Sequence, residues 1–222
     1  MSHEVEISLD EGHVSGLWLT PARPIAALAL AHGAGAGMRH VFMQALSEAL
    51  AEAGIATLRY QFPYMEAGRR FPDRPPRLIA TVAAAVATMR GLIGDLPLLA
   101  GGKSMGGRMS SQAAAAGSLD GVRGLVFFGF PLHPPKKPGT ERAEHLGSVE
   151  VPMLFLQGTR DALAGLDLLE PVCTELGPLA SLHIVDGADH GFAVLKRSGR
   201  TPDDVLAELA GSTRNWLDRI ET

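Results

Sequence analysis

The chain has 222 residues, of which 46% are hydrophobic and 20% are charged, a balance that excludes an intrinsically disordered protein. The 20 basic and 24 acidic residues give a formal net charge of -4, without the basic excess that nucleic-acid binding requires. The single cysteine, Cys173, favours a reducing compartment, because secreted proteins more often carry cysteines in pairs.

No segment of the sequence has the pattern of an export signal or a membrane span. Residues 1–10 are acidic and lack the apolar stretch of about 7 to 15 residues found in signal peptides. The apolar segments Ile25–Ala31 and Leu78–Met89 fall short of the roughly 18 residues that cross a bilayer. We therefore expect one domain over residues 1–222, in the cytoplasm, with neither a nucleic-acid nor a membrane partner.

The predicted strands fall into an opening hairpin and a series of apolar runs. Val5–Leu9 and Val14–Leu19 alternate in polarity around a turn at Glu11-Gly12, which predicts an antiparallel hairpin. The later runs are uninterrupted, as is typical of strands covered on both faces. They are Ile25–Ala31, Ile55–Leu58, Leu96–Ala100, Leu125–Phe128, Met153–Leu156 and Leu182–Val185.

Helical patterns alternate with these runs at Phe42–Ala53, Leu78–Met89 and Ser110–Ala116. A last helix begins at Thr201, where Pro202 and two aspartates are typical of a helix N-terminus. Its apolar face is formed by Val205, Leu209, Trp216 and Ile220. The alternation predicts an α/β fold, with a mostly parallel twisted sheet of about eight strands flanked by helices and the hairpin at an antiparallel edge.

In such sheets ligands bind at the carboxyl ends of the strands, where this chain has unusual residues. Gly102-Lys103-Ser104-Met105-Gly106 matches G-x-S-x-G, a sharp strand-to-helix turn that exposes a serine hydroxyl. The preceding apolar run and the small-residue helix that follows fit this turn. Ser104 is therefore the candidate nucleophile.

Two other interpretations of this turn are weaker. A phosphate-binding loop needs a glycine at position 97, where the chain has Pro97. A glycine-rich turn with an incidental serine would need no partner residues elsewhere in the chain.

A nucleophilic serine needs a histidine to accept its proton and a carboxylate to orient that histidine. In this architecture the two follow in the order acid then histidine, each on a loop after a strand. Asp161 and His190 have this placement, and Asp186 and Asp189 are reserve candidates for the acid.

The segment 32–37, His-Gly-Ala-Gly-Ala-Gly, follows a predicted strand and has almost no side-chain bulk. Amides of Gly33, Ala34 and Met105 are candidates for an oxyanion hole, although a small loop kept for packing is the alternative. We expect His32 to brace this loop by hydrogen bonding. The remaining histidines have no metal-ligand spacing, so we predict no metal site and no cofactor.

Together these motifs resemble the α/β-hydrolase superfamily, from about residue 25 to the C-terminus. The likeness rests on HGAGAG at 32–37, GGKSMGG at 101–107, QGTRD at 157–161 and GADHGF at 187–192. RYQFPYME at 59–66 and FPLHPPKKP at 130–138 resemble a small dienelactone-hydrolase-like group, which includes a testis-expressed hydrolase-like protein and a subunit of a chromatin acetyltransferase complex. Dienelactone hydrolases proper use a cysteine nucleophile, so their substrate does not transfer to Ser104. The chromatin member implies that the scaffold can also serve in binding.

The segment Leu132–Pro152 is only about 20 residues long, too short for a large helical lid. An open site favours a small soluble acyl substrate, with His32, Tyr64 and Lys103 as candidate pocket residues. The basic residues Arg69, Arg70, Arg74, Lys136 and Lys137 either favour an anionic acyl group or form a solvated surface.

The sequence thus predicts a serine hydrolase acting on an ester or thioester through Ser104, His190 and Asp161. The alternative from another class is a non-catalytic protein-binding module on the same scaffold. Nothing in the sequence sets the oligomeric state.

Overall fold

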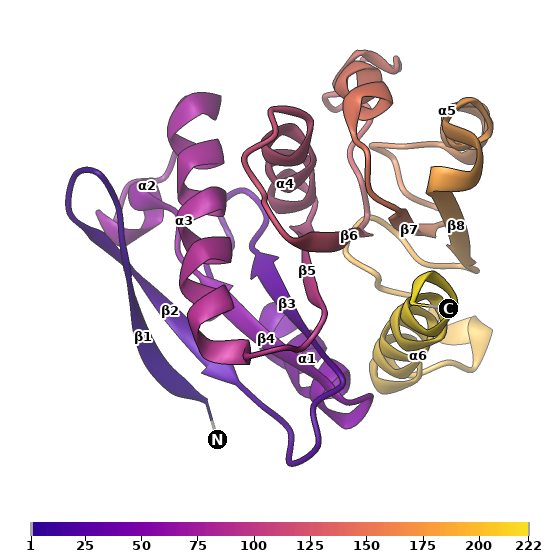
Figure 1. The fold of residues 1–222 in the computed structure, drawn as a ribbon. Helices are drawn as coiled ribbons and strands as arrows, with labels where there is room; N and C mark the ends of the chain where they lie inside the picture. The colour runs from indigo at the N-terminus through magenta and orange to yellow at the C-terminus, as the bar shows by residue number, and fades with distance from the viewer. Residues whose placement is uncertain (1, 222) are drawn as a thin grey trace.

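The strands form one mixed sheet in the computed structural model, which describes residues 2–221. Within those residues the sheet has eight strands in the order β1-β2-β4-β3-β5-β6-β7-β8 (Figure 1). Their bounds are β1 (His3–Ser8), β2 (His13–Leu19), β3 (Ala26–Ala31), β4 (Ile55–Tyr60), β5 (Leu98–Lys103), β6 (Val122–Phe128), β7 (Met153–Gly158) and β8 (Ala180–Val185).

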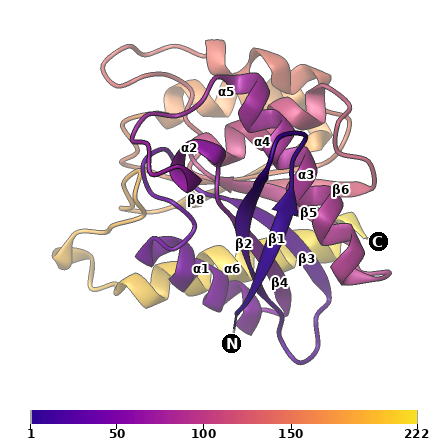
Figure 2. The same ribbon diagram turned by 90° about the vertical axis from the view of Figure 1, so that its left-hand side faces the viewer.

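The first two strands are antiparallel, and the rest of the sheet is parallel. β1 pairs with β2 and β2 pairs with β4 in antiparallel register, whereas all the pairings from β4 to β8 are parallel. Figure 2 shows the β1–β2 hairpin at the edge of the sheet. The predicted mostly parallel sheet with an antiparallel edge is confirmed.

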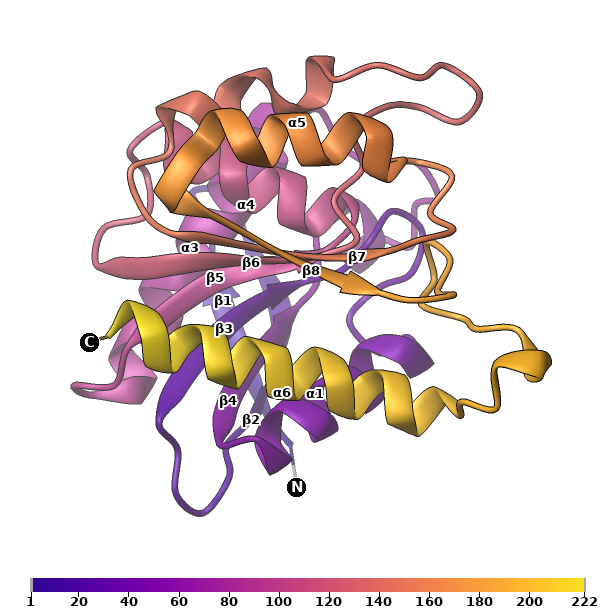
Figure 3. The ribbon, with the colours of Figure 1, turned by 90° about the vertical axis from the view of Figure 1, so that its right-hand side faces the viewer.

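Helices cover both faces of the sheet (Figures 1 and 3). One face is covered by α1 (Val41–Glu52) and α6 (Pro202–Ile220), and the other by α3 (Pro75–Ile93), α4 (Met105–Ala115) and α5 (Leu166–Leu176). Four short helices lie in the connections, namely α2 (Pro63–Glu66) and the 3₁₀ helices η1 (Glu141–Ser148), η2 (Gly177–Leu179) and η3 (Lys196–Ser198).

The central strand β3 illustrates why the sheet needs both layers. All six of its residues are buried, and the alternation of alanine and leucine assigns them to two cores. Leu28 and Leu30 pack in the core that contains α1 and α6, whereas Ala29 and Ala31 belong to the core that contains α3 and α4. Each fully buried leucine stabilises the fold by about 1.5–3 kcal/mol.

The last helix begins where its sequence predicts. Thr201 Oγ1 accepts from the Asp204 amide at 3.1 Å, and Asp204 Oδ2 accepts from the Thr201 amide at 2.7 Å. This reciprocal cap satisfies two amides at the helix start. The side chains of Val205, Leu209 and Trp216 are buried, as the predicted apolar face requires.

Two helices are longer than their apolar patterns. The helix predicted over Ser110–Ala116 begins at Met105, because the glycines after Ser104 are already helical. α3 extends beyond Leu78–Met89 to 19 residues, and its mean hydropathy of 1.3 over an 18-residue window is sufficient for a membrane span by length and composition alone. This corrects the expectation that the segment is too short. Leu78, Val82 and Val86 are nevertheless buried in the core of the sheet.

The connection from β6 to β7 contains no lid. Its helical part is η1, whose Ala143 and Leu146 are buried. His145 Nε2 lies 2.7 Å from Ser111 Oγ on α4, so η1 is held against the helix layer. The expectation that residues 132–152 form no large lid is confirmed.

Candidate active site

Ser104 lies at the junction of β5 and α4, in the backbone conformation that the motif predicts. Its φ of 51° and ψ of -114° fall in a region that non-glycine residues rarely adopt. The Ser104 amide donates to the carbonyl of Phe128 on β6 at 3.2 Å, which ties the turn to the neighbouring strand. The turn leaves the serine only partly buried.

The flanking glycines allow this turn to sit against β3. A Cβ at Gly102 would lie 2.2 Å from the carbonyl oxygen of Ala31, and a Cβ at Gly106 would lie 2.5 Å from the same oxygen. Both distances are far below van der Waals contact. Glycine is therefore required on each side of Ser104 for strand, turn and helix to pack together.

Three side chains from distant loops meet at this turn. Ser104 Oγ lies 2.9 Å from His190 Nε2, and His190 Nδ1 lies 2.7 Å from Asp161 Oδ2. When the serine hydroxyl donates to Nε2, the ring proton is on Nδ1 and is donated to the carboxylate. This is the arrangement in which an imidazole can remove a proton from a serine.

Asp161 is the acid of the three candidates that contacts the histidine. Its side chain is 1% exposed, and its oxygens also accept from Gln157 Nε2 at 2.6 Å and from the Leu163 amide at 2.8 Å. Asp189 Oδ1 instead accepts from the amides of Gly191 and Ala193, at 2.8 and 3.0 Å. Asp189 thus shapes the loop that carries His190.

The loop after β3 lies beside the turn. A Cβ at Gly33 would lie 3.7 Å from the Cβ of Ser104. Two hydrogen bonds hold this loop in place. The Gly35 amide donates to Tyr64 Oη at 3.2 Å, and the Met38 amide donates to Gln61 Oε1 at 2.9 Å. Met105 is the first residue of α4, where amides lack partners within the helix and anions are favoured.

His32 supports the same loop from within the core. Nε2 accepts from the Phe62 amide at 3.2 Å, so Nδ1 carries the proton and donates to the Gly33 carbonyl at 2.7 Å. Burial lowers the pKa of this imidazole to about 4. His32 and Tyr64 are both fully buried. The expectation that they line a substrate pocket stays a prediction, as does the assignment of oxyanion donors to Gly33, Ala34 and Met105.

Lys103, the third candidate pocket residue, lies directly before Ser104. It is 9% exposed, and its Nζ lies 5.6 Å from the centroid of the Phe192 ring. Phe192 was not identified from the sequence, although it comes from the same loop as His190. Gln157 was given no role from the sequence, although it is the first residue of the QGTRD motif and a polar residue at the end of a buried strand.

Among the basic residues considered for an anionic acyl group, Arg69 is paired with a carboxylate. Arg69 forms an ion pair with Asp73 at 2.6 Å, and Arg77 lies 3.8 Å from the same carboxylate. Arg70, Arg74, Lys136 and Lys137 are exposed. Within residues 2–221 no group of three or more His, Cys, Asp or Glu side chains is placed to hold a metal ion.

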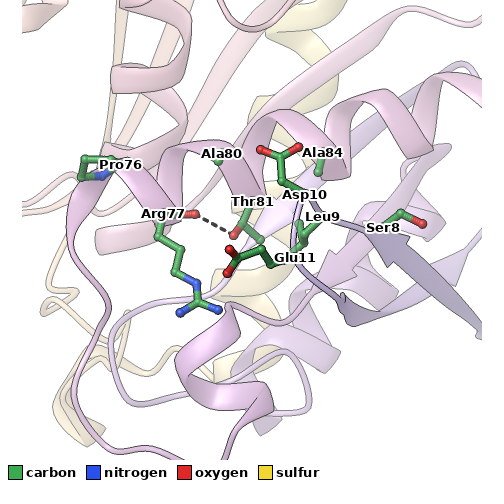
Figure 4. Close-up of a pocket in the computed structure, with 9 residues that line it drawn as sticks. All are labelled: Ser8, Leu9, Asp10, Glu11, Pro76, Arg77, Ala80, Thr81 and Ala84. Atoms are coloured by element: carbon green, nitrogen blue, oxygen red, sulfur yellow. Dashed lines mark hydrogen bonds between the residues drawn. The ribbon is translucent and has the colours of Figure 1, made fainter.

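A groove of about 640 Å³ lies elsewhere on the molecule, between the β1–β2 turn and α3. Figure 4 shows its lining, in which Glu11 from the turn lies toward Arg77 and Thr81 of α3, whereas the Asp10 carboxylate points away from Arg77. The lining includes none of Ser104, Asp161 and His190. The size of this groove therefore says nothing about chemistry at Ser104.

The profile of a family described as "Alpha/beta hydrolase domain" matches residues 24–218. Dienelactone hydrolase from Anabaena variabilis is 21% identical with a TM-score of 0.78, and the alignment covers 99% of this chain and 97% of that one.

Two further structures have the same architecture. XC6422 from Xanthomonas campestris, described as an α/β serine hydrolase without a lid, is 19% identical with a TM-score of 0.76, covering 97% of this chain and 94% of that one. Est1E from Butyrivibrio proteoclasticus is 15% identical with a TM-score of 0.73, covering 98% of each chain. At these identities the likeness to solved structures shows the fold alone.

Proposed function

The chain belongs to the alpha/beta hydrolase domain family, and on that premise we propose that it is a serine hydrolase of small soluble carboxylic esters or thioesters. One observation carries the proposal. Ser104, His190 and Asp161 make two consecutive contacts of 2.9 and 2.7 Å, although they come from three separate loops. The names of structural neighbours, which include hydrolases and an esterase domain, agree with it.

The first half of the reaction is acylation of Ser104. As Ser104 Oγ attacks the carbonyl carbon, its proton passes to His190 Nε2 and the carbonyl π electrons move to the oxygen. We assign stabilisation of that oxyanion to the amides of Ala34 and Met105, with Gly33 as a further donor. When the tetrahedral intermediate collapses, His190 gives the proton to the leaving alcohol or thiol. The acyl group then remains on Ser104.

Deacylation repeats these steps with water. His190 accepts a proton from the attacking water, and the bond between the acyl carbon and Ser104 Oγ breaks as the proton returns to the serine. Asp161 keeps the proton on Nδ1 and stabilises the imidazolium in both halves. Gln157 and the Leu163 amide hold the carboxylate in place for this role.

The short β6–β7 connection favours a small soluble substrate, because no lid is present to open at a lipid surface. One structural neighbour is a dienelactone hydrolase. The family resemblance implies a cysteine nucleophile for dienelactone hydrolases proper, whereas this chain has Ser104 at that position. The proposal for this chain therefore does not include the dienelactone substrate. A cytoplasmic location also belongs to the proposal, on the evidence of the single cysteine.

The narrower likeness to the group that includes a testis-expressed protein and a chromatin-complex subunit rests on residues 59–66 and 130–138 alone. It provides the second candidate function, a protein-binding module without catalysis. The aligned contacts of Ser104, His190 and Asp161 favour catalysis, because a binding module has no need of them.

The test is hydrolysis of p-nitrophenyl esters of increasing acyl length, with acyl-CoA and peptide substrates alongside. We expect turnover of short esters or thioesters, and S104A should lower kcat by about 10³-fold or more. S118A, which alters an exposed serine just beyond α4, is the matched control and should retain full activity. Equal activity in S104A and the native protein would reject the assignment.

A further inference from the structure

Arg59 on β4 is a buried cation whose hydrogen-bonding capacity is mostly unused. The residue is 3% exposed, and it forms no ion pair within residues 2–221. A guanidinium has five N–H donors, and one of them, on Nη1, donates to the Met38 carbonyl at 3.1 Å. Nε has no hydrogen-bond partner among the described residues. Burying a charge in this state is costly, which indicates an anionic partner that the protein itself does not supply.

A pocket of about 320 Å³ is lined by Arg59 on the sheet face that α1 covers. Arg59 lies directly opposite Leu17 of β2 on one side and Leu30 of β3 on the other, and Leu30 packs in the core that contains α1. Residues that lie directly opposite one another project to the same face of a sheet. Gln44 and Glu48, one turn apart on α1, also line the pocket. It therefore fills the angle between α1 and the antiparallel edge of the sheet.

Leu17 and Leu19 of β2 give this pocket an apolar wall. Leu17 is buried and Leu19 is half-buried. Because side chains alternate along a strand, Trp18 between them projects to the opposite face. The volume of the pocket is at the lower end of the range for small-molecule sites, roughly 300–1,000 Å³. A ligand of a few carbon atoms could pack on this wall with its polar end at Arg59.

The other charged groups around the pocket limit the charge of such a ligand. Arg39 lines the pocket and forms an exposed ion pair with Glu4 at 2.6 Å. Burial lowers the pKa of the Arg59 guanidinium and Arg39 adds to that shift, while Glu48 opposes it. Arginine nevertheless stays protonated at neutral pH. Glu48 and Glu4 would repel a dianion more strongly than a monoanion.

We propose that this pocket is a binding site for a small monocarboxylate. The carboxylate pairs with the Arg59 guanidinium, and a short apolar group packs on Leu17 and Leu19. A guanidinium suits this ligand because two of its N–H groups can donate in parallel to the two oxygens of one carboxylate. The lining includes none of Ser104, Asp161 and His190, so the proposal is independent of the hydrolase function.

The test is an NMR titration of the native protein with sodium butyrate at constant ionic strength. The readout is the methyl resonances of Leu17 and Leu19, each assigned by substitution. We expect saturable shifts of both residues with a Kd of about 10 mM or below. Butylamine has the same chain with the opposite charge and should give no saturable shift. Inorganic phosphate, largely a dianion above neutral pH, should bind more weakly than butyrate.

Three variants connect the shifts to the charges of the pocket. R59M should abolish saturation, because the partner of the carboxylate is removed. E48Q removes a like charge from the wall and should lower the Kd for butyrate about 3-fold. E52Q is the matched control, because Glu52 is an exposed residue one turn further along α1 that does not line the pocket. Its Kd should equal that of the native protein.

Several outcomes would overturn the proposal. Shifts that increase linearly with butyrate, or that occur only around Ser104, would show that the pocket does not bind the carboxylate. Tighter binding of phosphate than of butyrate, or the same Kd in folded R59M as in the native protein, would also contradict it. If R59M does not fold, an unchanged Kd in E48Q overturns the proposal. Failure of the protein to hydrolyse any ester would reject the proposed function and leave this test unaffected.

Discussion

Gln157 donates from Nε2 to Asp161 Oδ2 at 2.6 Å, and the same carboxylate oxygen lies 2.7 Å from His190 Nδ1. The other end of the amide is also occupied, because Oε1 accepts from the Phe130 amide at 3.0 Å. Gln157 is fully buried at the end of β7. It therefore links the carboxylate that orients the histidine to the backbone beyond β6.

The substitution Q157L preserves most of the side-chain volume but removes both hydrogen bonds of the amide, so we expect it to lower both stability and kcat. The Asp161 carboxylate loses a donor and the Phe130 amide loses its acceptor, so the free energy of unfolding should fall by about 1–3 kcal/mol. Because the carboxylate then keeps only the Leu163 amide to hold it in place, it orients His190 less firmly, and kcat should fall about 10-fold to 100-fold. Urea unfolding and ester hydrolysis measure the two effects. A variant with native kcat would show that Gln157 has no part in orienting the pair.

Gly102, two residues before Ser104, should tolerate no side chain. In G102A the new methyl group would lie 2.2 Å from the Ala31 carbonyl oxygen, so we expect a loss of about 3 kcal/mol or more in unfolding free energy, or no folded protein. G91A is the control, because a Cβ there meets nothing within 4 Å and the position is helical. It should be neutral or stabilising by about 0.5–1 kcal/mol. Equal stability of the two variants in urea would contradict this packing.

Because His32 is buried, we expect the free energy of unfolding to fall as the pH is lowered. Its pKa is about 4 in the folded protein against 6.5 as a free side chain, so the unfolded chain binds more protons between these values. The stabilisation is present above pH 6.5 and is lost as the pH falls towards 4, by up to about 3 kcal/mol.

Urea midpoints measured between pH 7 and 4.5 test this dependence. The decline should be shallower in H32Q than in the native protein, although H32Q is less stable at pH 7. H13Q changes an exposed histidine and should decline as the native protein does. His145, whose pKa burial also lowers to about 4, adds to the acid sensitivity of all three proteins. Parallel curves for H32Q and the native protein would show that His32 is not the titrating group.

Local patterns in the sequence predicted most of the sheet and the turn at Ser104. Apolar runs mark strands because a strand covered on both faces is buried at every position, as in β3. The prediction of β4 stopped at Leu58, whereas the strand continues through Arg59 and Tyr60. Arg59 is buried because its guanidinium donates to the distant Met38 carbonyl, a contact that periodicity cannot reveal.

The helix α5 was missed for a related reason. Its apolar residues Leu168, Leu169, Val172, Cys173 and Leu176 fall on one helical stripe and pack on the core, but Pro171 lies inside the helix and interrupts the helical pattern. Asp161 and His190 could be predicted because the motif fixes their order along the chain. The surroundings of Lys103 could not, because Gly129, Asp161 and Phe192 reach it from three different segments.

The most direct test of the central claim is the site of a covalent adduct. The native protein should react with a fluorophosphonate probe, and peptide mass spectrometry should place one adduct on Ser104. S104A and H190Q should remain unlabelled, because the first lacks the hydroxyl and the second lacks the base. Folded native protein that stays unlabelled, or that carries the adduct on another residue, would contradict the assignment of Ser104 as the nucleophile.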